Sequence, residues 1–183
     1  MNYRFISLIF ASIATMVSLF AEPVRVGMLN YELDSKQNTA KVVCCEITGD
    51  ITIPEQIFVK DTLYTVTSIG ERAFCKDHHL MSITFPKSLI SIEKEAFMDC
   101  SSLTRLILPQ SIINLGNRAF ADCLQLKEIY NLNVTPVLIN TNVFNNVNLS
   151  RCILIVHPSA IASYKSAKGW QNFKNIYPLD VRQ

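Results

Sequence analysis

The chain has 183 residues, of which 49% are hydrophobic, and a formal net charge of +2. This length suits one domain of ordinary size. Lysine and arginine are interleaved with acidic residues, so the chain lacks the basic stripe that nucleic-acid binding requires. With five glycines in total, it also lacks a glycine-rich loop that could cradle a phosphate.

Residues 1–21 have the pattern of a secretory signal peptide. Arg4 supplies the positive start, Phe5–Phe20 is an uncharged run, and Ala21 is the expected cleavage point. The alternative is a retained N-terminal anchor, although the run is shorter than the ~20 residues that a membrane span needs. The pattern predicts a secreted, periplasmic or cell-surface protein with no membrane span after cleavage.

Residues 22–50 are predicted to form an N-terminal β cap. Gly27–Leu33 and Ala40–Ile47 alternate between apolar and polar residues, which predicts two antiparallel strands joined around Asp34–Asn38. Residues 51–65 read as an incomplete repeat, because Ile51–Pro54 is a short strand pattern that ends in proline. The insertion that follows, Glu55–Thr65, is expected to be a hairpin or a loop.

Residues 66–134 contain three copies of a 23-residue repeat, Val66–Ser88, Leu89–Ser111 and Ile112–Val134. Apolar residues keep their positions in all three copies. The aligned sets are Ile69, Ile92 and Leu115; Phe74, Phe97 and Phe120; Leu80, Leu103 and Leu126; and Ile83, Leu106 and Ile129. A fixed period of ~20–50 residues indicates a solenoid or a similar array.

Each copy predicts one coil of a spiral. Leu80–Phe85 alternates as a strand does, and Pro86 ends it because proline cannot donate to a sheet. Glu71–Phe74 is expected to form one tight helical or 3₁₀ turn that points Phe74 inward. Since one coil cannot bury its own apolar residues, neighbouring coils must stack to complete the core.

Residues 135–183 are predicted to form an irregular last coil and a C-terminal cap helix. Phe144 is expected to continue the series of inward phenylalanines, and Cys152–Pro158 to supply another strand. A helix is expected from Pro158 or Ser159, with Gly169 as its stop or kink. Its apolar face, which would seal the last coil, consists of Ile161, Tyr164, Ala167, Trp170, Phe173 and Ile176.

The repeats resemble a known family. The pattern L-x-x-[IL]-x-[FL]-P resembles the strand of a leucine-rich repeat, and Gly70, Gly116, the three Ala-Phe pairs, Cys100 and Cys123 resemble the BspA-like class of these repeats. The first repeat departs from that class at Asp77 and the third at Asn131-Leu132. The resemblance, which covers roughly residues 51–174, implies a β-rich α/β solenoid: a right-handed coil of 23-residue repeats with both caps.

Two states are open for the cysteines of adjacent repeats. Cys100 and Cys123 lie one repeat apart, so they should stack on neighbouring coils within the Cα distance of a disulfide. Buried free thiols are the other reading, because cysteine also packs as a small apolar residue. The chain has no C-x-x-C spacing, so no zinc site is predicted.

The sequence predicts no enzyme. The three histidines, His78, His79 and His157, do not accompany a nucleophile elbow, a phosphate loop or an H-E-x-x-H motif. We therefore assign no catalytic, cofactor-binding or metal-binding residue.

The candidate site is the outward face of the repeat strands. Alternation along each strand predicts two rows of exposed side chains, which are Ser82, Arg105 and Glu128, and Thr84, Ile107 and Tyr130. The rows form either a protein-binding surface or an ordinary solvated sheet face. The resemblance implies a non-enzymatic surface protein that adheres to host or extracellular-matrix proteins; the alternative is a small secreted inhibitor or a structural envelope protein.

Overall fold

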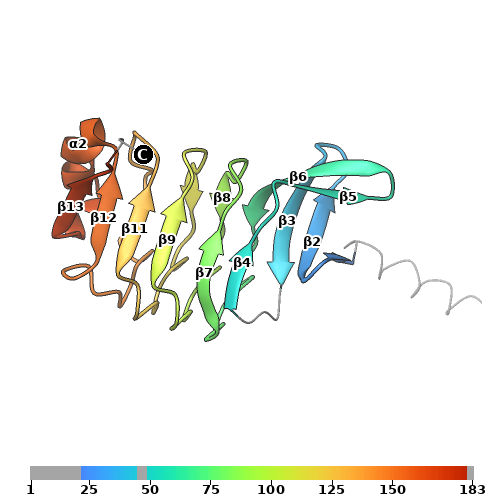
Figure 1. Ribbon diagram of the computed structural model, residues 1–183, viewed down its shortest axis with the longest axis horizontal. Coiled ribbons are helices and arrows are strands. Elements are labelled where there is room, and N and C mark those ends of the chain that lie inside the picture. The colour runs from blue at the N-terminus through green and yellow to red at the C-terminus, as the bar shows by residue number, and fades with distance from the viewer. Residues whose placement is uncertain (1–21, 45–48, 181–183) are drawn as a thin grey trace, which may run out of the picture.

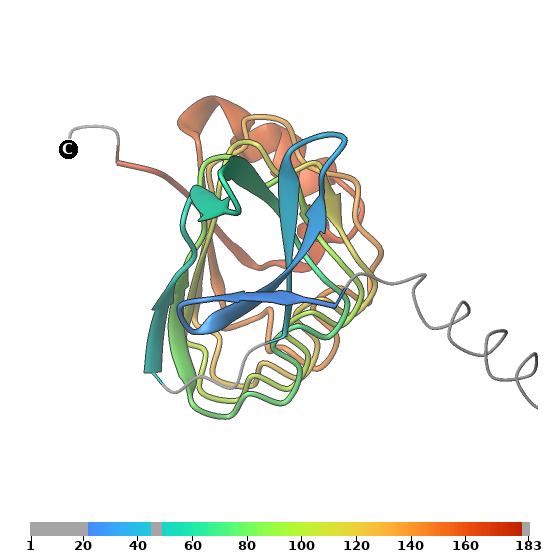
Figure 2. The same cartoon turned by 90° about the vertical axis from the view of Figure 1, so that its right-hand side faces the viewer.

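The computed structural model describes residues 22–44 and 49–180, so the predicted signal peptide lies outside the described residues. The chain forms an elongated solenoid of about six turns whose strands stack along the long axis (Figure 1). Viewed along that axis, the coils superimpose in a roughly triangular outline (Figure 2). The predicted leucine-rich solenoid is confirmed.

The first side of the solenoid carries one strand from each coil. These strands are β4 (Gly49–Thr52), β7 (Leu80–Thr84), β9 (Arg105–Leu108), β11 (Glu128–Asn131), β12 (Ile153–Val156) and β13 (Asn175–Pro178). They form two hydrogen-bonded parallel sheets, β4–β7 and β9–β11–β12–β13. We call the outward surface of these six strands the strand face.

The second side is a sheet that joins the N-terminal cap to the repeats. Its strands are β1 (Val24–Val26), β2 (Leu29–Asp34), β3 (Thr39–Cys44), β5 (Gln56–Val59), β6 (Thr62–Ile69), β8 (Ser91–Ile92) and β10 (Asn114–Leu115). β2 and β3 are antiparallel, as predicted, and the insertion is an antiparallel hairpin of β5 and β6. From β3 onward, β6, β8 and β10 add in parallel.

The third side consists of turns, and the predicted single helical turn at Glu71–Phe74 is wrong. Arg72 and Lys76 have positive φ angles of 58° and 64°, which break the segment into successive turns. Backbone N–H groups then alternate in direction: that of Ala73 donates to Gly70 O, and that of Phe74 donates to Ala96 O on the next coil. A helix would direct all of these donors back along its own axis, whereas the turns tie adjacent coils together.

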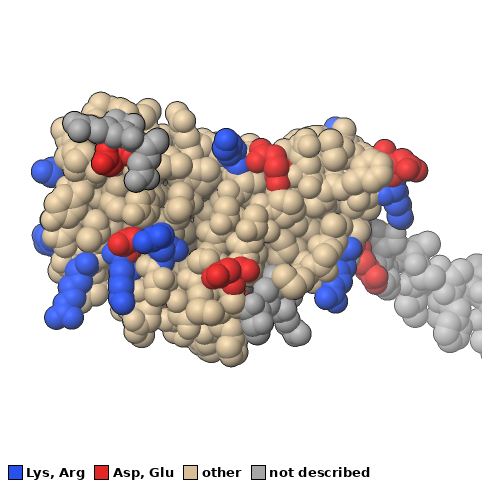
Figure 3. Space-filling view, in the orientation of Figure 1, with Lys and Arg blue, Asp and Glu red and all other residues tan. Residues whose placement is uncertain are grey.

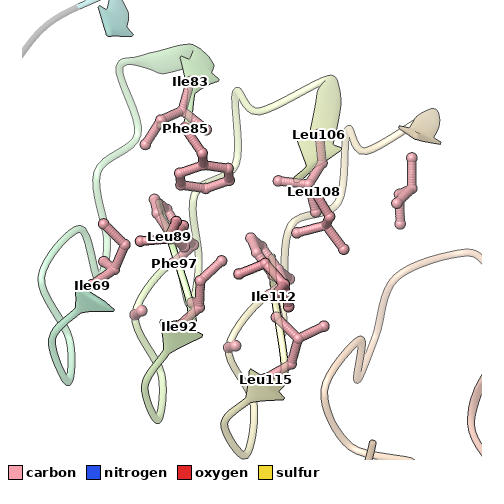
Figure 4. Packing of buried hydrophobic residues seen from close by; sticks show 14 of the residues in the cluster. Ile69, Ile83, Phe85, Leu89, Ile92, Phe97, Leu106, Leu108, Ile112 and Leu115 are labelled. Atoms are coloured by element: carbon pink, nitrogen blue, oxygen red, sulfur yellow. The ribbon is translucent and has the colours of Figure 1, made fainter. Parts of the chain in front are cut away.

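Phenylalanine side chains stack through the middle of the solenoid. Phe74 and Phe97 lie 4.8 Å apart between ring centroids, and Phe97 and Phe120 lie 5.2 Å apart. Phe144 continues the stack at 5.8 Å from Phe120, as predicted. All four are buried. Figure 4 shows Phe97 among core side chains that come from both sheets, such as Ile92 and Leu106.

Cys100 and Cys123 are buried free thiols. Their Sγ atoms lie 3.1 Å from the carbonyl oxygens of Phe74 and Phe97, respectively, to which the thiols donate. Each cysteine therefore bonds to the coil before its own. Of the two states that the sequence leaves open, the structure has the unbridged one.

The C-terminal cap differs from the predicted helix. A 3₁₀ turn, Pro158–Ala160, leads into α2 (Ile161–Ser166), and a second 3₁₀ turn covers Trp170–Asn172. Gly169 has a φ of 85°, which a helix cannot continue through. Ile176 lies in β13 and not in the helix, because β13 fills the open edge of β12.

The seal that the cap was expected to form is present. Tyr164, Trp170 and Phe173 are buried, and the indole of Trp170 packs 5.7 Å from the ring of Phe144. The Trp170 Nε1–H donates to Val137 O at 2.8 Å, so the buried indole nitrogen is satisfied.

Candidate protein-binding face

The strand face holds all six residues of the predicted rows. Ser82 and Thr84 lie on β7, Arg105 and Ile107 on β9, and Glu128 and Tyr130 on β11. The register places Arg105 beside Glu128 and Ile107 beside Tyr130, as predicted.

The three strands that carry the predicted rows do not form one continuous hydrogen-bonded sheet. Among the described strands, β7 pairs with β4 and not with β9, so Ser82 and Thr84 stand beside Asp50 and Thr52. Ser82 Oγ donates to Asp50 Oδ1 at 2.7 Å. The two coils also differ in their core: Phe85 occupies the position of the smaller Leu108 in the next repeat and packs edge-on against Phe97.

Arg105 binds both of its neighbours on β11. Its Nε donates to Glu128 Oε2 at 2.8 Å, and its guanidinium carbon lies 5.8 Å from the centre of the Tyr130 ring. An exposed ion pair contributes only ~0–1 kcal/mol, and an exposed cation–π contact about 0.5–1 kcal/mol. These contacts therefore add little to stability, but they hold the side chains of Tyr130 and Arg105 next to each other on the surface.

Ile153, Ile155 and Tyr177 extend the predicted rows onto β12 and β13. Ile153 and Ile155 on β12 lie beside Glu128 and Tyr130, and Tyr177 on β13 lies beside Ile155. They were missed because the repeat period slips after Val134 and because the segment that contains β13 was assigned to a helix. The alternation within Cys152–Val156 was the available signal for the two isoleucines.

One outward row therefore runs across four neighbouring strands, and we call it the Tyr–Ile row. Its members, in spatial order, are Ile107, Tyr130, Ile155 and Tyr177. Ile107 and Tyr177 are 45% and 53% exposed, whereas Tyr130 and Ile155 are half-buried. Figure 3 looks onto this face and shows uncharged side chains over most of it.

A shallow cavity opens between the two tyrosines of the row. It has a volume of about 380 Å³, and its walls include Tyr130 and Tyr177, with Ile153 and Ile155 from the strand between them. Pro178, Leu179 and Asp180 close its other end. The cavity lining therefore combines apolar side chains with two phenol groups and the carboxylate of Asp180.

His78 Nδ1 lies 3.1 Å from Ser101 Oγ at the corner between two coils. Within residues 22–44 and 49–180, no three or more His, Cys, Asp or Glu side chains gather closely enough to hold a metal ion. Nor does the described part of the chain contain a helix that could cross a membrane.

Comparison with known proteins supports the assignment of the repeats. The family model for the BspA type leucine rich repeat region matches residues 45–166 in six copies. No curated protein matches the chain.

Among solved structures, a leucine-rich repeat protein from Bacteroides capillosus is 25% identical, with a TM-score of 0.57, and the match covers 87% of this chain and 100% of that one. A leucine rich cell surface protein from Faecalibacterium prausnitzii is 16% identical with a TM-score of 0.45, over 78% of this chain and 53% of that one. The pneumococcal vaccine antigen PcpA is 18% identical with a TM-score of 0.46, over 78% and 51%.

Proposed function

Since the chain belongs to the BspA-type leucine-rich repeat family, we propose that it is a secreted or cell-surface protein without enzymatic activity that binds other proteins. We further propose that it adheres to host or extracellular-matrix proteins. The observation that carries this proposal is the Tyr–Ile row, which aligns aromatic and aliphatic side chains on one accessible face. The signal-peptide pattern of residues 1–21 supports export.

The composition of the strand face suits protein recognition. Interface centres are enriched in tyrosine and arginine and depleted in unpaired charge. Tyr130, Tyr177 and Arg105 supply the favoured side chains, and the charge of Arg105 is matched by Glu128. An ordinary solvated sheet face would place polar side chains at Ile107, Ile153 and Ile155.

The area of the face limits its affinity. Six strands of about four residues, spaced ~4.8 Å apart, cover roughly 400 Å². A specific interface of standard size takes ~800 Å² from each partner. One copy should therefore bind weakly, and several copies displayed together should bind strongly through avidity.

Binding of the purified protein to a panel of immobilised matrix proteins tests the proposal. We expect saturable binding to at least one of them and a loss of about tenfold or more in the double variant Arg105→Ala/Tyr130→Ala. The matched control is Arg25→Ala/Phe58→Ala, which removes an exposed arginine and an exposed aromatic outside the strand face.

Equal binding by both double variants would exclude the strand face as the contact surface. Absence of saturable binding to any matrix protein would instead favour the inhibitor or structural role.

A further inference from the structure

The Tyr–Ile row repeats its chemistry every second strand. Tyr130 and Tyr177 lie on β11 and β13, with Ile155 of β12 between them, and Ile107 lies on the other side of Tyr130. At a strand spacing of ~4.8 Å, equivalent positions two strands apart are separated by ~9.6 Å. The face therefore alternates between tyrosine ridges and isoleucine positions with that period.

The hydrogen-bonding groups beside the row are mostly donors. The phenols of Tyr130 and Tyr177 and the guanidinium of Arg105 can each donate outward. Of the two carboxylates beside the row, Glu128 accepts from Arg105 Nε, and Asp180 lies at the end of the cavity. Between the donors, Ile153, Ile155, Pro178 and Leu179 supply the apolar part of a lining that is otherwise polar. Such a surface suits a ligand with apolar ridges and exposed acceptors but few donors.

We propose that the strand face binds a proline-rich segment in the polyproline II conformation, laid across the strands. This inference rests on the proposed function and specifies the chemistry of the partner. Polyproline II rises ~3.1 Å per residue with three residues per turn, which gives ~9.3 Å per turn and matches the ~9.6 Å period of the row. Successive turns of the segment occupy the cavity over Ile155 and the surface over Ile107, on either side of the Tyr130 ring.

The hydrogen-bonding pattern of such a segment also matches the face. Polyproline II forms no internal hydrogen bonds, so its carbonyl groups are available to accept. Proline has no N–H, so the segment requires few acceptors from the protein. Tyr130, Tyr177 and Arg105 supply the donors, and aromatic-lined grooves recognise this helix in other binding modules.

The same surface suits a saccharide chain poorly. Tyrosine rings can stack on sugars, but sugar hydroxyls lose their water hydrogen bonds when they are buried and need polar partners in exchange. The cavity offers two phenols and one carboxylate, that of Asp180, while Ile153, Ile155, Pro178 and Leu179 form the rest of its lining. We therefore assign a peptide ligand and use a sugar chain as the competing probe.

Fluorescence anisotropy with labelled decaproline, with a Gly-Ser decapeptide and a cello-oligosaccharide as competing probes, tests the inference. We expect saturable binding of decaproline, weakened about tenfold or more by either Tyr130→Ala or Tyr177→Ala. Tyr130→Phe keeps the ring and removes the donor, so we expect a smaller loss of a few-fold. Phe58→Ala, an exposed aromatic outside the face, is the control and should bind as the unmodified protein does.

Methyl NMR locates the ligand independently of the variants. Decaproline should shift the methyl signals of Ile107, Ile153 and Ile155, and leave that of Ile113, an exposed isoleucine outside the row, unchanged. Circular dichroism of each variant checks that its fold is intact.

Preference for the Gly-Ser peptide or the oligosaccharide, equal binding by the tyrosine variants, or no binding of decaproline would each overturn the inference. If decaproline fails to bind while Arg105→Ala/Tyr130→Ala still loses adherence to a matrix protein, the proposed function stands and only the partner chemistry is wrong. If both fail, the strand face has neither role.

Discussion

Glu95 lies almost fully buried at a corner between two coils, where a carboxylate needs a partner. Arg72 of the preceding coil supplies it, with Nε donating to Glu95 Oε2 at 2.6 Å. This hydrogen bond holds the pKa of Glu95 below its ordinary value, and burial only partly opposes it. The equivalent positions of successive repeats thus bind coils to one another through side chains as well as through the backbone.

Stability should fall in acid partly because of Glu95. Because the pKa of Glu95 is lower in the folded protein, the unfolded chain binds the proton first as pH falls. The stabilisation by Glu95 is therefore complete above the ordinary carboxyl pKa. It is lost as pH falls through the pKa of the folded protein. Urea unfolding between pH 7 and about pH 3.5 should show a smaller decrease in the free energy of unfolding for Glu95→Gln than for the unmodified protein. The exposed-residue control Glu22→Gln should behave as the unmodified protein, and an equal decrease in Glu95→Gln would contradict the account.

The thiols should differ in reactivity according to burial. Burial raises the pKa of the Cys152 thiol to about 12, and the pKa of Cys100 is raised by the neighbouring Cys123 thiol and by burial. Cys75 is only half-buried. Alkylation followed by peptide mass spectrometry should label Cys75 before these three, and label all four in denaturant. Recovery of a peptide that links Cys100 to Cys123 would show that the disulfide forms.

At the scale of the coil, the turns determine how closely neighbours approach. A Cβ added to Gly116 would lie 2.5 Å from the backbone carbon of Glu93 on the preceding coil. The Gly116 N–H donates to Ile92 O at 2.8 Å, which holds the two backbones together at this point. Glycine is thus required here by contact with another coil and not by its own φ angle.

Gly116→Ala should therefore destabilise the protein by roughly 1–3 kcal/mol, because the added methyl forces two backbones apart. Chemical denaturation measures the change. Ile113→Ala, which shortens a side chain that is 71% exposed, is the control and should change stability by less than about 0.5 kcal/mol. A neutral effect of Gly116→Ala would mean that the coils separate easily at this corner.

At the scale of the whole molecule, one stack of rings joins the repeats to the C-terminal cap. Phe74, Phe97, Phe120 and Phe144 follow one another, and Phe144 contacts Trp170 of the cap. Each coil depends on its neighbours for burial, so loss of one ring should weaken the array as a unit.

Phe97→Ala should reduce the free energy of unfolding by about 3–5 kcal/mol, as other buried phenylalanine truncations do. Trp170 is the only tryptophan of the chain, so its fluorescence reports on the cap, while far-UV circular dichroism reports on all coils. Both denaturation curves should shift together. A loss below about 1 kcal/mol, or a shift in the dichroism curve alone, would contradict a shared core.

The sequence by itself determined the repeat and the inward phenylalanines, and it left the insertion as a hairpin or a loop. These features follow from side-chain periodicity and from proline and glycine positions, which act over a few residues of chain. The 23-residue period relates β9 to β11 directly, so the sequence also predicted one shared face for Arg105, Ile107, Glu128 and Tyr130.

Tertiary structure alone decided how the strand face continues and how the corners are bonded. Glu128 pairs with Ile153, an offset of 25 residues, so the fixed period could not bring Ile155 and Tyr177 into the row. Ile176 fits a helical spacing, yet its segment pairs with the edge of β12 as a strand. Backbone hydrogen bonds at an open sheet edge outweigh a weak local preference for helix. The direction of each corner N–H likewise depends on whether a neighbouring coil offers a carbonyl, which one repeat considered alone does not contain.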